Sequence, residues 1–244
     1  MTCAAYSDPR LAAVYDALNP PGADNAFYTA FAGAVGKTLL DMGCGTGRLA
    51  VDLAALGHRV TGADPAAAML AIARRRPGGQ AVDWVRSSAA ALALPARFDQ
   101  IVMTGHVFQV FLTDAEALAA LRNLRRRLAP GGRLLFETRN PAARAWLAWT
   151  PERTRRVVAV PGLGNVEAHY AVTAVEGELV AYEPPFRFGP GDEAVAESRL
   201  RFMPQARLAA LLAEAGYASV TWYGDWDRAP LGPESRELIV VAGS

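Results

Sequence analysis

From Lys37 onward, short apolar runs alternate with segments whose apolar residues recur at helical spacing. The apolar runs predict strands at residues 39–42, 58–63, 82–86, 98–103 and 133–138. The segments between them predict helices at residues 47–56 and 66–75 and one that begins at Thr113. Strands that alternate with helices are typical of strand-helix-strand units, whose strands run parallel. The pattern therefore predicts an α/β fold built on a mostly parallel sheet.

The pattern changes in residues 151–203, where strand-like runs are separated by Gly and Pro turns and little helical spacing remains. The strand-like runs cover residues 157–160, 166–175, 179–182 and 198–202. A helix between Pro204 and Gly216 and a strand at residues 237–241 then return to the earlier pattern. We therefore expect an antiparallel β-sheet inserted into the α/β fold.

The composition is that of an ordinary folded protein, with 52% hydrophobic and 20% charged residues among 244 and a net charge of +1. So small a charge provides no general attraction to nucleic acid or to an anionic membrane. No basic start with an apolar core opens the chain, and no apolar run approaches the roughly 20 residues that span a bilayer. The two cysteines, Cys3 and Cys44, have no metal-ligand spacing, and no disulfide between them is expected. We expect a cytoplasmic protein without a metal and without nucleic acid or a membrane as partner.

The segment with the most chemical content is Leu-Leu-Asp-Met-Gly-Cys-Gly-Thr-Gly at residues 39–47. It ends a predicted strand and opens a predicted helix, where backbone N–H groups are unpaired and the helix dipole is positive. Glycine at three alternate positions allows a tight turn and close approach of a ligand to the backbone. A dinucleotide-binding loop would carry Gly or Ala where this chain has Arg48, and no Gly-Lys-Ser/Thr of a phosphate loop follows. The loop therefore favours a bulky ligand of another kind.

A carboxylate, Asp64, stands at the end of the second predicted strand. In a parallel sheet this position lies beside the glycine loop, where a carboxylate can accept hydrogen bonds from two ribose hydroxyls. Asp64 also precedes the helix predicted at residues 66–75, so it can serve as an ordinary N-cap. The two roles are compatible.

Together the loop and Asp64 resemble the class I S-adenosylmethionine-dependent methyltransferases. The first motif of that family is similar to residues 40–47, its fourth strand to residues 98–102 and its turn into the fifth strand to residues 128–134. The resemblance implies a Rossmann-like, doubly wound fold with a mostly parallel seven-stranded sheet. It also implies S-adenosyl-L-methionine as the cofactor and methyl transfer to an O or N atom of a small molecule.

The resemblance suggests a division of the chain into three parts. Residues 1–36 are expected to form an N-terminal helical cap over the cofactor, and residues 37–150 and 204–244 the Rossmann-like cofactor-binding domain. The inserted sheet at residues 151–203 would be the lid over the substrate. An exposed strand edge serves a lid or a homodimer interface, and the sequence leaves both open.

The family motifs carry the first cofactor contacts over residue by residue. By this resemblance Asp41 and the glycine loop would hold the methionine portion, and Asp64 the ribose hydroxyls. Pro65 and Met69 would pack against the adenine. The loop residues are Gly43, Cys44, Gly45, Thr46 and Gly47.

The remaining cofactor positions follow the third and fourth strands. Members of the family often carry an acid after the third strand that accepts from the adenine amino group, whereas this chain has Ser88 and Ala89. The Ser88 hydroxyl and the N–H of Ala89 can still contact the adenine, but the pattern departs from the family here. Thr104, Gly105 and His106 would flank the sulfonium end of the cofactor.

The acceptor side is less defined, because methyl transfer needs alignment and exclusion of water more than a dedicated base. His106 can act as a base or be a packed, hydrogen-bonded histidine. Gln109 can orient an acceptor or face the cofactor. Tyr15 and Tyr28 belong to a segment that folds over the cofactor or packs an aromatic face on the core. Arg139 can bind an acidic group of the substrate or form a structural ion pair.

Two other functions compete with methyl transfer. A protein of this fold can bind the cofactor without transferring a methyl group, as a binding module or a natural-product cyclase. A nicotinamide-dependent oxidoreductase would share the glycine loop and Asp64, but Arg48 contradicts it. A methylated product would exclude the first, and nicotinamide binding would support the second.

Overall fold

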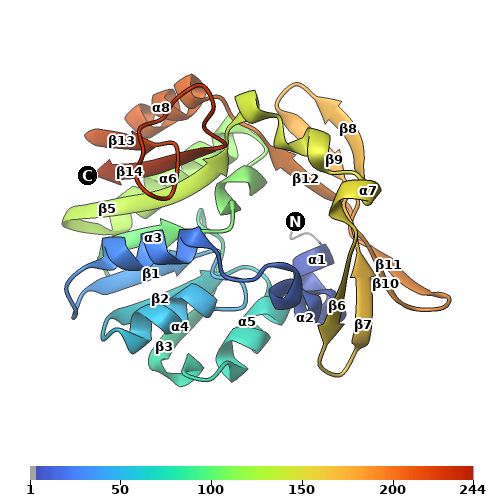
Figure 1. Cartoon of the computed structure of the whole chain (residues 1–244). Helices are drawn as coiled ribbons and strands as arrows, with labels where there is room; N and C mark the ends of the chain where they lie inside the picture. The colour runs from blue at the N-terminus through green and yellow to red at the C-terminus, as the bar shows by residue number, and fades with distance from the viewer. Residues whose placement is uncertain (1–3, 244) are drawn as a thin grey trace.

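The computed structural model describes residues 4–243 and is built around one seven-stranded sheet (Figure 1). The strand order is β13-β14-β5-β4-β1-β2-β3. Strands β1 to β5 run parallel to one another, and β14 is antiparallel to both β5 and β13. The bounds are β1 (Thr38–Met42), β2 (Arg59–Asp64), β3 (Val82–Arg86), β4 (Phe98–Met103), β5 (Leu128–Arg139), β13 (Ser219–Tyr223) and β14 (Glu237–Gly243). This confirms the predicted α/β fold with a mostly parallel sheet.

Helices cover both faces of the sheet. On one face, Phe27 of α3 (Ala23–Ala32) and Leu53 of α4 (Arg48–Ala55) pack with Leu39 of β1. On the other face, Leu121 of α6 (Asp114–Arg127) and residues of α8 (Gln205–Glu214) pack with Leu40. Because neighbouring residues of β1 belong to different cores, the strand is buried on both faces, which explains its unbroken apolar run.

The local signals around α6 are confirmed in detail. The Thr113 side chain accepts a hydrogen bond from the N–H of Glu116 at 3.2 Å, and the Glu116 carboxylate accepts one from the N–H of Thr113 at 3.1 Å. This is a capping box, and it confirms the helix start expected at Thr113. The helix ends at Arg127, and β5 begins at once at Leu128, earlier than the expected residue 133.

The insertion forms two antiparallel sheets of orders β11-β10-β7-β6 and β12-β9-β8, not one. The predicted run at residues 166–175 is divided between two strands, and β10 and β11 were missed because their sequence is rich in Gly, Pro and charged residues. A short helix, α7 (Pro151–Thr154), precedes them. The bounds are β6 (Arg156–Val160), β7 (Gly164–Ala168), β8 (Val172–Glu176), β9 (Leu179–Tyr182), β10 (Pro185–Gly189), β11 (Asp192–Val195) and β12 (Ser198–Arg201).

The N-terminal helices α1 (Ala4–Ser7) and α2 (Pro9–Leu18) lie between the sheet domain and the insertion (Figure 1). One side of α2 packs Leu11 and Val14 against Val160 and Val166 of the insertion. Ala12 packs instead with Met69 at the start of α5 (Ala67–Arg75). The helix α2 therefore joins the two parts. Within residues 4–243, no helix is long and apolar enough to cross a membrane.

Candidate active site

The glycine loop lies between β1 and α4, at the carboxyl edge of the sheet, where open α/β folds bind ligands. Gly43, Gly45 and Gly47 all have left-handed backbone, with φ of 78°, 53° and 78°. A Cβ at Gly47 would lie 2.4 Å from Trp84 Cη2, whereas a Cβ at Gly45 would meet nothing within 4 Å. Gly47 is therefore needed for packing, and Gly45 borders open space that a ligand can fill.

Asp64 connects the loop to the start of α5. Its Oδ2 accepts a hydrogen bond from the N–H of Gly45 at 3.0 Å, and its Oδ1 accepts one from the N–H of Ala66 at 2.7 Å. Burial raises the pKa of this carboxyl, and the two backbone N–H groups partly oppose that rise. Asp64 thus organises the start of the helix, and each oxygen keeps a second lone pair for another donor.

Asp41, at the end of β1, is almost completely buried, and within the described residues its Oδ1 has no hydrogen-bond partner. Burial, followed by the charges of Asp64 and Glu137, raises the pKa of Asp41 to about 7. An unpaired buried carboxylate oxygen is costly, so it suits a ligand that brings a donor or a positive charge. The amino group and sulfonium of the expected cofactor supply both, so the residues present fit that group.

The other positions expected around the cofactor differ in their burial and contacts. Cys44 is a buried, free thiol, and Cys3 lies outside the described residues. Met69 is buried beneath α2, and Pro65 is half-buried. Ala89 is buried with its carbonyl accepting from Asn123 at 2.8 Å. Ser88 is exposed, and Thr104 and Gly105 follow β4 directly.

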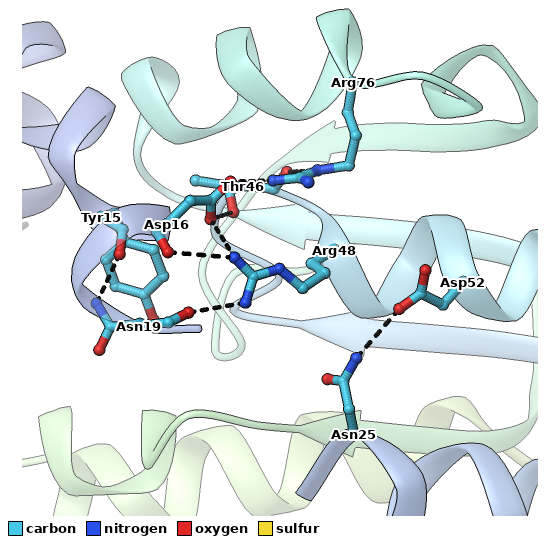
Figure 2. Close-up of polar contacts among 8 residues, drawn as sticks. All are labelled: Tyr15, Asp16, Asn19, Asn25, Thr46, Arg48, Asp52 and Arg76. Atoms are coloured by element: carbon cyan, nitrogen blue, oxygen red, sulfur yellow. Dashed lines mark hydrogen bonds and ion pairs between the residues drawn. The ribbon is translucent and has the colours of Figure 1, made fainter. Parts of the chain in front are cut away.

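The carboxylate of Asp16, on α2, binds the glycine-loop region through three side chains (Figure 2). It accepts a hydrogen bond from the Thr46 hydroxyl at 2.6 Å and pairs with the guanidinium groups of Arg48 at 3.2 Å and of Arg76. Arg76 also donates to the Thr46 carbonyl at 2.9 Å. We call these four residues the Asp16 cluster. It holds α2 over the loop.

Next to Asp16, Tyr15 reaches the segment after β4. A Cβ at Gly105 would lie 3.5 Å from the Tyr15 hydroxyl. Burial, then the charges of Tyr170 and Asp16, raises the pKa of Tyr15 to about 12. The phenol therefore stays neutral, and its hydroxyl lies against Gly105.

His106 is held from two sides by carboxylates. Its backbone is left-handed, with φ of 61°, and its N–H donates to Glu137 Oε1 at 2.7 Å. Its Nε2 lies 3.1 and 3.0 Å from the two carboxylate oxygens of Glu237. Tyr28 is completely buried and donates its hydroxyl to the other oxygen of Glu137, whose pKa is raised by burial. Tyr28 therefore contacts the core and Glu137, as in the packing interpretation.

Gln109 and Arg139 form a second polar pair towards the insertion. Arg139 Nη1 donates to Gln109 Oε1 at 2.7 Å, and the Gln109 amide donates to the Arg201 carbonyl at 3.1 Å. Gln109 is completely buried. Arg139 Cζ lies 5.2 Å from the centroid of the Trp149 ring, which itself packs against Tyr170, Tyr182 and Phe202.

Sequence reasoning missed Asp16, Glu137, Glu237 and Trp149. Glu137 gave a usable signal, because a carboxylate within a strand buried on both faces needs a specific reason. Glu237 opened a predicted strand and Asp16 sat in a helix, where acids are ordinary. Within residues 4–243, no three His, Cys, Asp or Glu side chains are grouped as a metal site would require.

A family model described as a methyltransferase domain matches residues 39–132, from β1 to the start of β5. A C-methyltransferase of ubiquinone and menaquinone biosynthesis from Rubrivivax gelatinosus is 32% identical over 190 residues, which cover 77% of this chain and 65% of that protein. The chain spans about half the length of the next curated relatives it matches, which include a cypemycin N-terminal methyltransferase and a ubiquinone O-methyltransferase.

Solved structures resemble nearly the whole chain. The CcbJ methyltransferase from Streptomyces caelestis is 25% identical and superposes with a TM-score of 0.78 over 97% of this chain and 96% of that one. An amino pentose methyltransferase from Micromonospora echinaspora, solved with its S-adenosylmethionine bound, is 24% identical with a TM-score of 0.68 over 95% of this chain and 97% of that one. The likeness extends through the insertion.

Proposed function

We propose that the chain is a class I S-adenosylmethionine-dependent methyltransferase, which transfers the methyl group of S-adenosylmethionine to a nitrogen or oxygen atom of a small molecule. One observation carries the proposal. Gly45 borders open space and donates its N–H to the Asp64 carboxylate, and the charge of Asp64 acts on Asp41, whose buried Oδ1 has no partner among the described residues. A ligand with ribose hydroxyls at one end and a cationic amino acid at the other satisfies both.

The roles implied by the family fit these positions. Asp41 and the loop residues 43–47 would hold the methionine portion, and Asp64 the ribose. Pro65, Met69, Ser88 and Ala89 would line the adenine. Thr104, Gly105 and His106 would flank the reacting methyl group.

On the acceptor side, an amine is favoured. Two carboxylates, Glu137 and Glu237, lie on His106, and a nearby negative charge stabilises an ammonium group before transfer. Tyr15, Arg139 and the rings around Trp149 would contact the rest of the acceptor, with Gln109 orienting Arg139 and the insertion acting as the lid. We propose that the reaction takes place in the cytoplasm. The exposed strand edges of the insertion would also serve as the interface of a homodimer.

The first test is calorimetry of the protein with S-adenosylhomocysteine and, separately, with NADH. We expect binding of the nucleoside alone, weakened about tenfold or more by Asp64→Ala, which is about 1.4 kcal/mol. Asp83→Ala is the matched control, because Asp83 is an exposed acid on the neighbouring strand β3. Preference for NADH would overturn the proposal.

Methyl transfer itself is tested by release of S-adenosylhomocysteine from S-adenosylmethionine with a panel of amino sugars, other primary and secondary amines, and matched alcohols. We expect turnover with amines above that with alcohols of the same skeleton. Binding of the cofactor with no turnover across the panel would favour the protein that binds without transfer.

A further inference from the structure

Glu237 is the first residue of β14 and lies 131 residues from its partner His106. Both carboxylate oxygens lie within hydrogen-bonding distance of one imidazole nitrogen, Nε2, at 3.1 and 3.0 Å. An ionised carboxylate can only accept hydrogen bonds. Nε2 must therefore carry a hydrogen, and in the neutral ring Nδ1 then has a free lone pair. Within residues 4–243, Nδ1 has no hydrogen-bond partner.

The backbone of His106 is fixed independently of its ring. A left-handed φ of 61° is uncommon for a residue other than glycine and is retained only where the surroundings hold it. Here the buried carboxylate of Glu137 accepts the N–H of His106, and Tyr28 holds Glu137 in turn. Strain of this kind clusters at functional sites.

The segment that carries His106 packs directly on the glycine loop. A Cβ at Gly43 would lie 2.6 Å from Val107, and Tyr15 covers Gly105. His106 therefore stands at the edge of the cofactor space, with its side chain about one-fifth exposed.

We propose that Glu237 is a positioning residue, which holds His106 as the Nε2–H tautomer so that Nδ1 takes the proton of the methyl acceptor. This inference rests on the proposed methyl transfer. The acceptor N–H bond breaks, its proton binds the Nδ1 lone pair, and the Glu237 carboxylate stabilises the resulting imidazolium. The bound cofactor supplies the methyl carbon, whose bond to sulfur breaks with the electron pair left on sulfur, while the freed lone pair of the acceptor nitrogen forms the new bond.

The first test needs no acceptor. In protein labelled with ¹⁵N-histidine, the nitrogen shifts distinguish the tautomers of the three histidines, and His58 is an internal control. We expect His106 to be unprotonated at Nδ1, and its Nε2–H to exchange with water at least tenfold faster in Glu237→Ala. A proton on Nδ1 in the unaltered protein, or exchange unchanged by the substitution, would overturn the inference whether or not the protein is a methyltransferase.

The second test uses the best amine of the acceptor panel. Glu237→Gln should lower kcat about tenfold or more with a KM change below about threefold, since a positioned base contributes roughly 10²-fold or more. Glu237→Asp should recover part of the loss, and Glu234→Gln, an exposed acid on the preceding loop, should change neither constant. Unchanged kcat in Glu237→Gln contradicts the inference. If the unaltered protein does not bind S-adenosylhomocysteine, that result would instead contradict the proposed function.

Discussion

Glu237 and Arg139 face each other directly across β14 and β5, yet their opposite charges bind different partners. Glu237 binds His106, and Arg139 binds Gln109. Opposite charges at paired positions of antiparallel strands normally stabilise each other. Because they are separated, the Glu237 carboxylate orients the His106 imidazole and the Arg139 guanidinium lies beside the Trp149 ring.

Replacing Gln109 should remove what keeps these charges apart. Gln109→Leu leaves Arg139 and the Arg201 carbonyl without their partner, so we expect the free energy of unfolding to fall by about 1–3 kcal/mol. We also expect Arg139 to turn to Glu237, which changes the ¹⁵N shifts of His106. Urea unfolding and the histidine spectra measure the two effects. A spectrum identical to that of the unaltered protein would show that Gln109 does not control Arg139.

Removing the charge of Asp16 should weaken cofactor binding without unfolding the protein. In Asp16→Asn the contacts with Arg48 and Arg76 lose their ionic part, and we expect affinity for S-adenosylhomocysteine to fall about threefold to tenfold, or about 1 kcal/mol. Because these groups are partly exposed, the difference should shrink in high salt. Calorimetry at low and high salt measures it.

Asp52→Asn is the control for that experiment, since Asp52 accepts from Asn25 at 3.1 Å outside the Asp16 cluster (Figure 2). Its affinity should match that of the unaltered protein. Equal weakening by both substitutions would mean that loss of any negative charge in this region, and not loss of the contacts that Asp16 makes from α2, lowers the affinity for S-adenosylhomocysteine.

Two glycines of one loop should respond differently to alanine. Gly45→Ala adds a Cβ in open space, so the protein should stay folded at a backbone cost of about 1–2 kcal/mol while nucleoside affinity falls at least tenfold. Gly47→Ala drives its Cβ into Trp84 and should lower the melting temperature more. Thermal unfolding and calorimetry separate the two. Unchanged affinity in Gly45→Ala would place the ligand elsewhere.

Asp41 should make the cofactor-free protein lose stability as pH rises. Its folded pKa of about 7 lies above the ordinary value of 3.8, so between these values the folded state holds a proton that the unfolded state has released. Stability then falls as pH rises through this window. Asp41→Asn lacks this titration, so its stability relative to the unaltered protein should increase from pH 5 to pH 8 by on the order of 2 kcal/mol. If the free energy of unfolding in urea changes with pH equally in the two proteins, the raised pKa of Asp41 is contradicted.

Local pattern was enough for the parallel core of the fold. Leu39 and Leu40 belong to one unbroken apolar run because they enter different cores, and the Thr113 capping box marks a helix start without reference to the rest of the chain. Strand β13 was missed because it lies at the edge of the sheet, where Thr221 is exposed and Trp222 is only half-buried. Such strands form through pairing with a neighbour, which a local pattern does not contain.

The residues of the candidate active site also divide into those that the sequence could predict and those that it could not. The glycine loop and Asp64 are close in sequence and follow from the order of strands, so they were predictable. The partners of His106 were not, because Glu137 and Glu237 reach it only through the pairing of β4, β5 and β14. Asp16 likewise meets Arg48 and Arg76 only after α2 has packed.

The helix α2 binds its two neighbours by different forces. Charged groups hold it to the glycine loop, whereas the contact with the insertion is mainly apolar, with one exposed ion pair between Arg10 and Asp192 at 2.8 Å. Ionic strength weakens the first contact, while salts such as sulfate strengthen the second. Salt should therefore loosen the helix from the loop while the apolar packing keeps it on the insertion, so that nucleoside exchange becomes an opening of helix and insertion as one piece.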